Sequence, residues 1–163
     1  MISDSYMVPE GHVCPRSFGG LMALYESNYI KLSHLLGELQ AGELHAASIC
    51  TDDFPLHLVQ GAADSTRYTQ DLQLTYLFDG EGEQLADPDL HVRVYRDARM
   101  AEVRSWAAHH RHDALLQLRR SYGRELDRRW ARNMMLSKWL DYLVERGHVF
   151  RLSESLEYSH AEA

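Results

Sequence analysis

The stretch that decides the fold is Leu90-His-Val-Arg-Val-Tyr95, followed by Arg96-Asp-Ala-Arg99 and then Met100-Ala-Glu-Val-Arg-Ser105. The first and last segments alternate apolar and polar residues with a period of two, which is typical of a strand with one buried face. The segment between them suits a short hairpin loop, with Asp97-Ala98 at its centre. The sequence therefore predicts an antiparallel hairpin over 90–105.

The predicted turn also sets the register of this hairpin. The opposite pairs are Tyr95–Met100, Val94–Ala101, Arg93–Glu102, Val92–Val103 and His91–Arg104. Side chains directly opposite share a face of the sheet. We call one side the valine face: Val92, Val94, Ala101 and Val103. We call the other side the polar face: His91, Arg93, Tyr95, Met100, Glu102 and Arg104. On it we expect an Arg93–Glu102 ion pair, either solvated or orienting a ligand in a shallow groove.

The rest of the chain supplies two helices and three more strands. Apolar residues at helical spacing predict helices over 18–36, capped by Ser17 and stopped by Gly37, and over 125–146, stopped by Gly147. Strand patterns cover 46–51, 56–60 and 66–78. The predicted fold is α+β, an antiparallel sheet of about four to five strands with two amphipathic helices packed on the valine face.

The domain organisation follows from where these patterns stop. Residues 1–16 lack periodicity and predict a flexible N-terminal arm, and residues 17–151 a single α+β domain. Residues 152–163 predict a disordered acidic tail.

Charge is distributed unevenly along the chain of 163 residues, whose net charge is −7. Between His91 and Arg132, 11 arginines face five acids, a balance of +6, so the remainder carries −13. This asymmetry favours either internal pairing or a basic surface for an anionic partner.

No apolar run suits a membrane span, and two cysteines do not make a disulfide framework, so we expect a cytoplasmic protein without membrane contact.

Few residues suit catalysis or metal binding. His109-His-Arg-His112 lacks the spacing and partners of a zinc site, so we expect no metal and no cofactor. The acid–base candidates are His91, Asp97 and Glu102, and either His91 or Glu102 would need a cleft to act in catalysis.

Four motifs resemble one family. They are Ser65-Thr-Arg-Tyr-Thr69, the hairpin 92–103, the helix Tyr25–Leu32 with Leu35-Leu36, and the set Asp127, Asn133, Leu136, Trp139 and Leu140. Together they resemble the YqiB-like family of bacterial proteins, a domain of unknown function, over roughly residues 21–147. The resemblance implies a cytoplasmic bacterial α+β protein. It supports Arg67, Tyr68, Arg93, Tyr95, Asp97 and Glu102 as site candidates.

Three functions remain open. The first is a non-enzymatic module that binds an anionic small molecule or an acidic partner segment on the polar sheet face. Its ligand-binding candidates are Arg67, Tyr68, Thr69, Arg93, Tyr95, Asp97 and Glu102. The second is a small hydrolase-like enzyme using His91 or Glu102. The third is association with RNA or the ribosome through the arginine-rich region 93–132.

Overall fold

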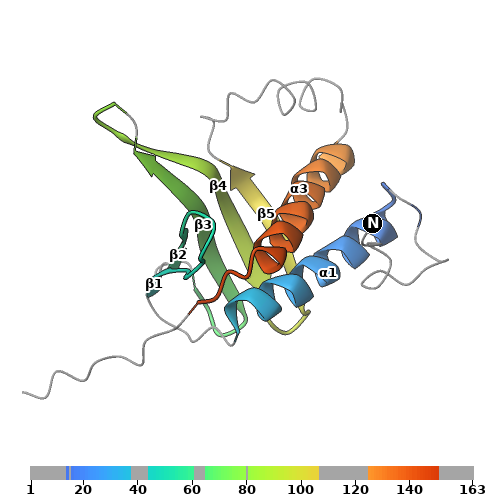
Figure 1. Cartoon of the computed structure of the whole chain (residues 1–163). Helices are drawn as coiled ribbons and strands as arrows, with labels where there is room; N and C mark the ends of the chain where they lie inside the picture. The colour runs from blue at the N-terminus through green and yellow to red at the C-terminus, as the bar shows by residue number, and fades with distance from the viewer. Residues whose placement is uncertain are drawn as a thin grey trace, which may run out of the picture.

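The computed structural model describes residues 14, 16–37, 44–60, 65–79, 81–106 and 125–150. In chain order the elements are α1 (Phe18–Leu36), β1 (Leu44–Ala47), β2 (Leu56–Gln60), β3 (Thr69–Asp79), β4 (Gln84–Tyr95), β5 (Met100–Trp106) and α3 (Glu125–Glu145). The five strands form one antiparallel sheet in sequence order, β1-β2-β3-β4-β5 (Figure 1). The predicted α+β class is confirmed.

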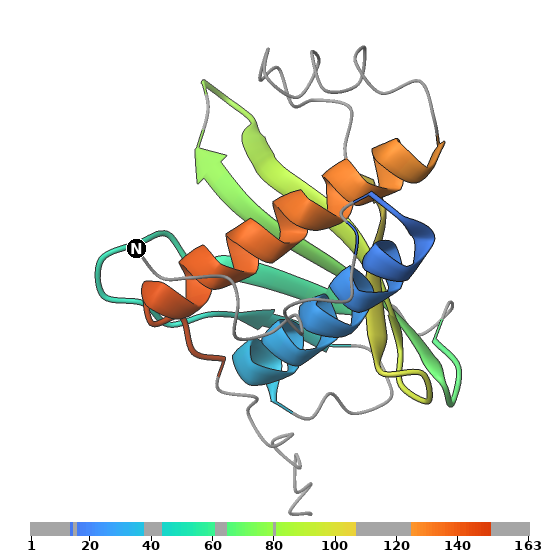
Figure 2. The same ribbon diagram turned by 90° about the vertical axis from the view of Figure 1, so that its right-hand side faces the viewer.

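Both helices cover the valine face of the sheet, as Figure 2 shows. All four side chains of that face are buried, and they join leucines of both helices in one core. The helical members of this core are Leu32, Leu35, Leu36, Leu136, Leu140 and Leu143. Burial of the valine face fixes the strand register, because a slip of one residue would turn these side chains toward water.

The predicted ends of α1 are confirmed in detail, and α3 ends at Glu145, one residue before the predicted end. The Ser17 hydroxyl accepts a hydrogen bond from the Gly20 amide at 3.0 Å, as an N-cap does. At the other end of α1, Gly37 has a φ of +69° and its amide donates to the Ser33 carbonyl. The left-handed conformation suits glycine and ends the helix.

The strand bounds differ from prediction at three places, and one of them is β3, which runs over Thr69–Asp79 rather than 66–78. β1 runs over Leu44–Ala47 rather than 46–51, and Ile49 instead forms a bridge with Val149. β4 begins six residues before Leu90, at Gln84. Its Pro88 has no N–H for the ladder, and the β3–β4 register shifts nearby. The alternating pattern therefore begins only after this irregular part of the strand.

The hairpin register is confirmed from Tyr95 to Val92 and is wrong beyond it. His91 pairs with Ser105 rather than with Arg104, because the register shifts between His91 and Val92. One extra residue, Arg104, is accommodated in β5 as a bulge. The bulge changes the direction of the strand close to the charged residues of β5.

Asn133 joins both helices to the edge of the sheet. Its side-chain oxygen accepts from the Val103 amide at 3.0 Å, and its side-chain nitrogen donates to the Arg129 carbonyl at 2.8 Å. Its own carbonyl accepts from the side chain of Asn28 in α1 at 3.1 Å. Two buried asparagines, Asn28 and Asn133, one from each helix, therefore meet in the core.

A partly buried ion pair also links the helices. Lys31 Nζ lies 2.9 Å from Asp141 and donates to the Ser137 hydroxyl at 2.8 Å. Later residues of α1 contact later residues of α3, so the helices run in the same direction, as Figures 1 and 2 show.

Neither helix carries an apolar stretch long enough to cross a membrane.

Several predictions lie outside the described residues. They are the N-terminal arm except Cys14 and Arg16, the tail 152–163, and the histidine cluster 109–112.

Asn133→Ala should lower the free energy of unfolding by about 1–3 kcal/mol, because it leaves the Val103 amide and the Arg129 carbonyl without their side-chain partner. Urea unfolding followed by circular dichroism measures the change. As the control, Val144→Ala on the exposed side of the same helix should change it by less than about 0.5 kcal/mol. Equal effects of the two substitutions would contradict the role of Asn133.

Candidate functional site

The polar face spans β3, β4 and β5. The register places Thr69 opposite Tyr95 and Asp71 opposite Arg93. Tyr95 in turn lies opposite Met100, and Arg93 opposite Glu102. Four predicted site residues therefore share one surface, as expected: Thr69, Arg93, Tyr95 and Glu102.

Arg93 forms its ion pair with Asp71, so the predicted Arg93–Glu102 pair is wrong. Arg93 Nε and Nη2 donate to the two Asp71 oxygens at 2.7 and 2.6 Å, a bidentate geometry. Arg93 lies between two carboxylates in the ladder, one on each neighbouring strand. It bonds to the one on β3, while other donors occupy Glu102.

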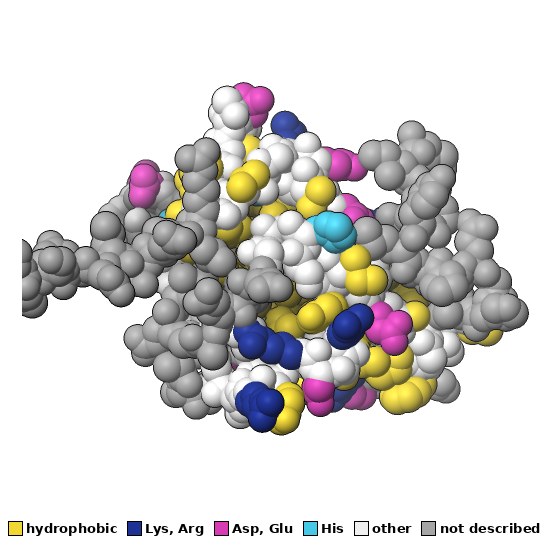
Figure 3. All heavy atoms as spheres, turned by 90° about the horizontal axis from the view of Figure 1, so that it is seen from below, with side chains coloured by type: hydrophobic (Ala, Val, Ile, Leu, Met, Phe, Trp, Pro, Cys, Tyr) yellow, Lys and Arg dark blue, Asp and Glu magenta, His cyan; other side chains and the backbone are white. Residues whose placement is uncertain are grey.

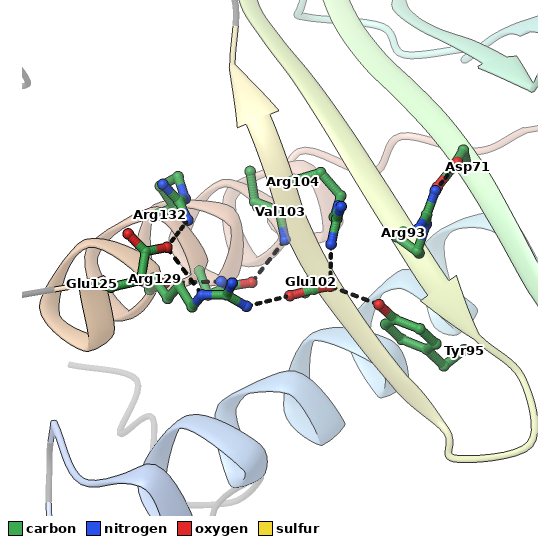
Figure 4. Close-up of polar contacts among 10 residues, drawn as sticks. Asp71, Arg93, Tyr95, Glu102, Val103, Arg104, Glu125, Arg129 and Arg132 are labelled. Carbon is green, nitrogen blue, oxygen red and sulfur yellow. Dashed lines mark hydrogen bonds and ion pairs between the residues drawn. The ribbon is translucent and has the colours of Figure 1, made fainter. Parts of the chain in front are cut away.

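Glu102 is the centre of a cluster of arginines and a tyrosine (Figure 4). The Tyr95 hydroxyl donates to Oε1 at 2.7 Å, and Arg104 Nη1 lies 3.4 Å from the same oxygen. Arg129 of α3 reaches Oε2 at 3.5 Å. The Glu102 side chain is only 7 % exposed, so this carboxylate is buried beneath its cationic partners.

α3 contributes the second half of this cluster, because its first turns lie beside the edge of β5 (Figure 4). Glu125 binds Arg129 at 3.1 Å and Arg132 at 3.5 Å. The Glu125–Arg129 spacing of four residues is a pattern that sequence can suggest. Its proximity to Glu102 depends on tertiary packing, and prediction from sequence missed it.

Two tyrosines border the cluster. Burial and then the nearby charge of Glu102 raise the pKa of Tyr25, against the lowering effect of Arg129. The Tyr25 hydroxyl is buried without a hydrogen bond of good geometry to any described residue. Burial and the hydrogen bond to Glu102 raise the pKa of Tyr95 as well. Both phenols therefore stay neutral at physiological pH, and Tyr95 donates its hydroxyl proton to Glu102.

The other predicted residues lie apart from this cluster. Arg67 and Tyr68 are exposed just before β3, with the guanidinium 5.4 Å from the centre of the ring. Asp97 accepts a hydrogen bond from the Ala98 amide within the turn. His91 is exposed on β4, and no contact with Glu102 joins it to the described cluster.

Sequence also gave no sign of a buried serine–histidine–aspartate group. Ser48 Oγ lies 2.7 Å from His148 Nδ1, and His148 Nε2 lies 3.1 Å from Asp53. If neutral His148 donates from Nε2 to Asp53, Nδ1 accepts the Ser48 proton. About 100 residues separate Ser48 from His148 in the chain, so no local spacing reveals the group.

This group has the composition of a hydrolytic triad without an accessible nucleophile. Ser48 is 4 % exposed, its oxygen also accepts from the Leu56 amide, and the His148 side chain is fully buried. A substrate carbonyl could not approach such an oxygen. The contacts instead fasten the segment after α3 to the connection between β1 and β2.

Metal binding has no support in the part of the chain that the structure describes. Among those residues, no three side chains of histidine, cysteine, aspartate or glutamate lie close enough to hold a metal ion.

A family model described as "Protein of unknown function (DUF1249)" matches residues 31–149. No curated protein and no solved structure matches the chain.

Asp53 should make the protein sensitive to acid. Burial acts to raise its pKa, but hydrogen bonds from His148 and the Phe54 amide outweigh this and hold it below the usual value. A depressed carboxyl pKa adds stability above the ordinary pKa, and this is lost as pH falls through the folded-state value. Asp53→Asn should therefore lower the urea midpoint at pH 7 and flatten its decline between about pH 5 and pH 2.

The exposed neighbour Asp52 provides the control for this measurement. Asp52→Asn should leave both the midpoint and its pH dependence close to those of the unchanged protein. An Asp53→Asn variant with the unchanged acid profile would disprove the contribution of this carboxylate.

Proposed function

Since the chain belongs to the DUF1249 family, whose function is unknown, we propose that it is a non-enzymatic binding module for an acidic partner segment. The binding surface is the polar face together with the adjoining first turns of α3. The partner supplies several carboxylates along an extended chain.

The observation that carries this proposal is a row of half-exposed arginines held by the protein's own carboxylates. The exposed fractions of their side chains are 31 % for Arg93, 49 % for Arg104 and 42 % for Arg129. Asp71, Glu102 and Glu125 fix their directions. Ordering a long side chain before binding lowers the entropic cost of the complex.

The guanidiniums keep donors for a ligand. A guanidinium has five N–H groups, and the contact of Arg104 with Glu102 involves one nitrogen, Nη1. Within the network of these ion pairs, four guanidiniums, including that of Arg132, meet three carboxylates, a balance of +1. This supports a ligand with carboxylate groups.

The arrangement suits an extended ligand better than a compact one. Arg93, Arg104 and Arg129 come from β4, β5 and α3, which follow one another across the surface (Figure 4). Neighbouring strands lie about 4.8 Å apart. Carboxylates repeated along a chain that crosses the strands can therefore meet successive arginines.

Tyr68, Arg67 and Thr69 extend the proposed surface beyond Tyr95. The Arg96 amide donates to the Tyr68 carbonyl, which ties this segment to the end of β4. Tyr68 is exposed and stacked by Arg67, a pair that offers both apolar area and charge. In this proposal it anchors one end of the partner segment.

The enzymatic alternative gains no support from the site. The two Glu102 oxygens face Tyr95, Arg104 and Arg129, so this carboxylate organises cations rather than meeting a substrate. We extend the proposal to a YqiB-like bacterial protein located in the cytoplasm. The free thiols of Cys14 and Cys50 are consistent with the proposed location.

A fluorescein-labelled decaglutamate peptide tests the proposal by fluorescence anisotropy. The protein should bind it with an affinity that falls as salt rises. Arg93→Gln and Arg104→Gln should each weaken binding about five- to tenfold, because each removes a cation from the row. Circular dichroism checks that both variants fold.

Arg146→Gln is the matched control, since Arg146 is exposed at the far end of α3, about 25 Å from Arg129 at 1.5 Å per residue. It should leave binding unchanged. The proposal fails if decaglutamate does not bind or if Arg146→Gln weakens binding as much. It also fails if labelled oligouridylate binds more tightly through the same arginines, which would assign the surface to RNA.

A further inference from the structure

A cavity lies on the opposite side of the sheet from the polar face, between α1 and the β4–β5 turn. Its volume is about 840 Å³, within the range of sites for small molecules. Gln70 and Val94 line it from the strands, and Tyr29, Ile30 and Ser33 from α1. Arg96 and Arg99 line it from the turn.

Arg99 gives the cavity an uncommitted positive charge. Within the described ranges, no carboxylate lies within ion-pair distance of its guanidinium, unlike that of Arg93, Arg104 or Arg129. Its φ of +53° is uncommon for a residue with a side chain. Arg96 and Arg99 begin and end the four-residue segment that joins the two strands, and both line the cavity.

The other walls are largely apolar. Leu32 and Val94 are buried and belong to the core, while Ile30 is 41 % exposed at the surface of α1. Seen from the end of the molecule where this turn and the end of α1 lie, basic side chains lie beside hydrophobic ones (Figure 3). A ligand there would meet cations and apolar area together.

We propose that this cavity binds a small carboxylic acid with an apolar body. Its carboxylate would bind the Arg99 guanidinium, a bidentate geometry that arginine favours, with Arg96 close by. Its apolar body would lie against Ile30 and Val94, where its burial is favourable.

Charge balance favours a monoanion over a phosphate. Arg99 contributes one positive charge that no described carboxylate pairs, and Glu26 also lines the cavity, so the charge available to a ligand is a single positive one. A single carboxylate matches this balance, whereas a phosphate dianion would exceed it and approach Glu26. The cavity does not include the arginines of the polar face, so this inference stands apart from the proposed function.

Octanoate is a suitable probe, with octanamide and octylamine as neutral and cationic analogues of the same length. Titration followed by methyl NMR should show saturable shifts of Ile30 and Val94 with octanoate and none with either analogue. Arg99→Gln should weaken octanoate binding at least fivefold, and Arg146→Gln should leave it unchanged. Circular dichroism checks the fold of each variant.

Ser33→Phe gives an independent test, because Ser33 is exposed on α1 and a larger side chain there would occupy the cavity without disturbing the core. It should abolish octanoate binding and leave decaglutamate binding intact, which separates this site from the polar face. The inference is overturned if octanoate causes no shifts, if octanamide binds equally well, or if both Arg99→Gln and Ser33→Phe bind octanoate normally.

Discussion

The hydrogen bond between the Val103 amide and the Asn133 side chain is the constraint on which the rest of the structure depends. β5 is an edge strand, and an edge strand presents amides and carbonyls that lack a neighbouring strand. Asn133 satisfies one such amide from the side of α3 and binds the Arg129 carbonyl one helical turn earlier. The same contact therefore protects the sheet edge and brings Arg129 to Glu102.

The polar contacts between the helices serve alignment rather than gross stability. Asn28 meets Asn133, and Lys31 meets Asp141, so the pairing holds at two levels along parallel helices. Leucine packing alone tolerates sliding, whereas a buried amide or ammonium without its partner is costly. The Lys31–Asp141 ion pair adds little net stability, because desolvation of Lys31 offsets much of the attraction and water screens the partly exposed Asp141. Its value here is that only one alignment of α1 and α3 satisfies both contacts.

Local pattern accounts for much of the fold. Ser17 and Gly37 mark the ends of α1 because capping depends on neighbouring residues, and the valine face fixes the hairpin near its turn. The bulge at Arg104 and the start of β4 beyond Pro88 were missed because each breaks the alternation that sequence reasoning follows. Two features form between segments that lie far apart in the sequence, and local patterns do not specify such contacts. They are the ion pair of Arg93 with Asp71 and the Ser48–His148–Asp53 group.

The arginines of the segment 91–132 fall into two groups with different surroundings, which composition alone does not distinguish. On the polar face, arginines alternate with carboxylates, so their charge is largely balanced and their main gain is a fixed direction. At the β4–β5 turn, Arg99 lines a cavity with no described carboxylate in ion-pair range. Balanced arginines favour a ligand that brings several weak contacts, since each must compete with an existing partner. An uncommitted arginine beside apolar walls favours a small ligand, because its one strong contact replaces only water. The difference lies in the pairing of each cation, which the net charge of a segment does not reveal.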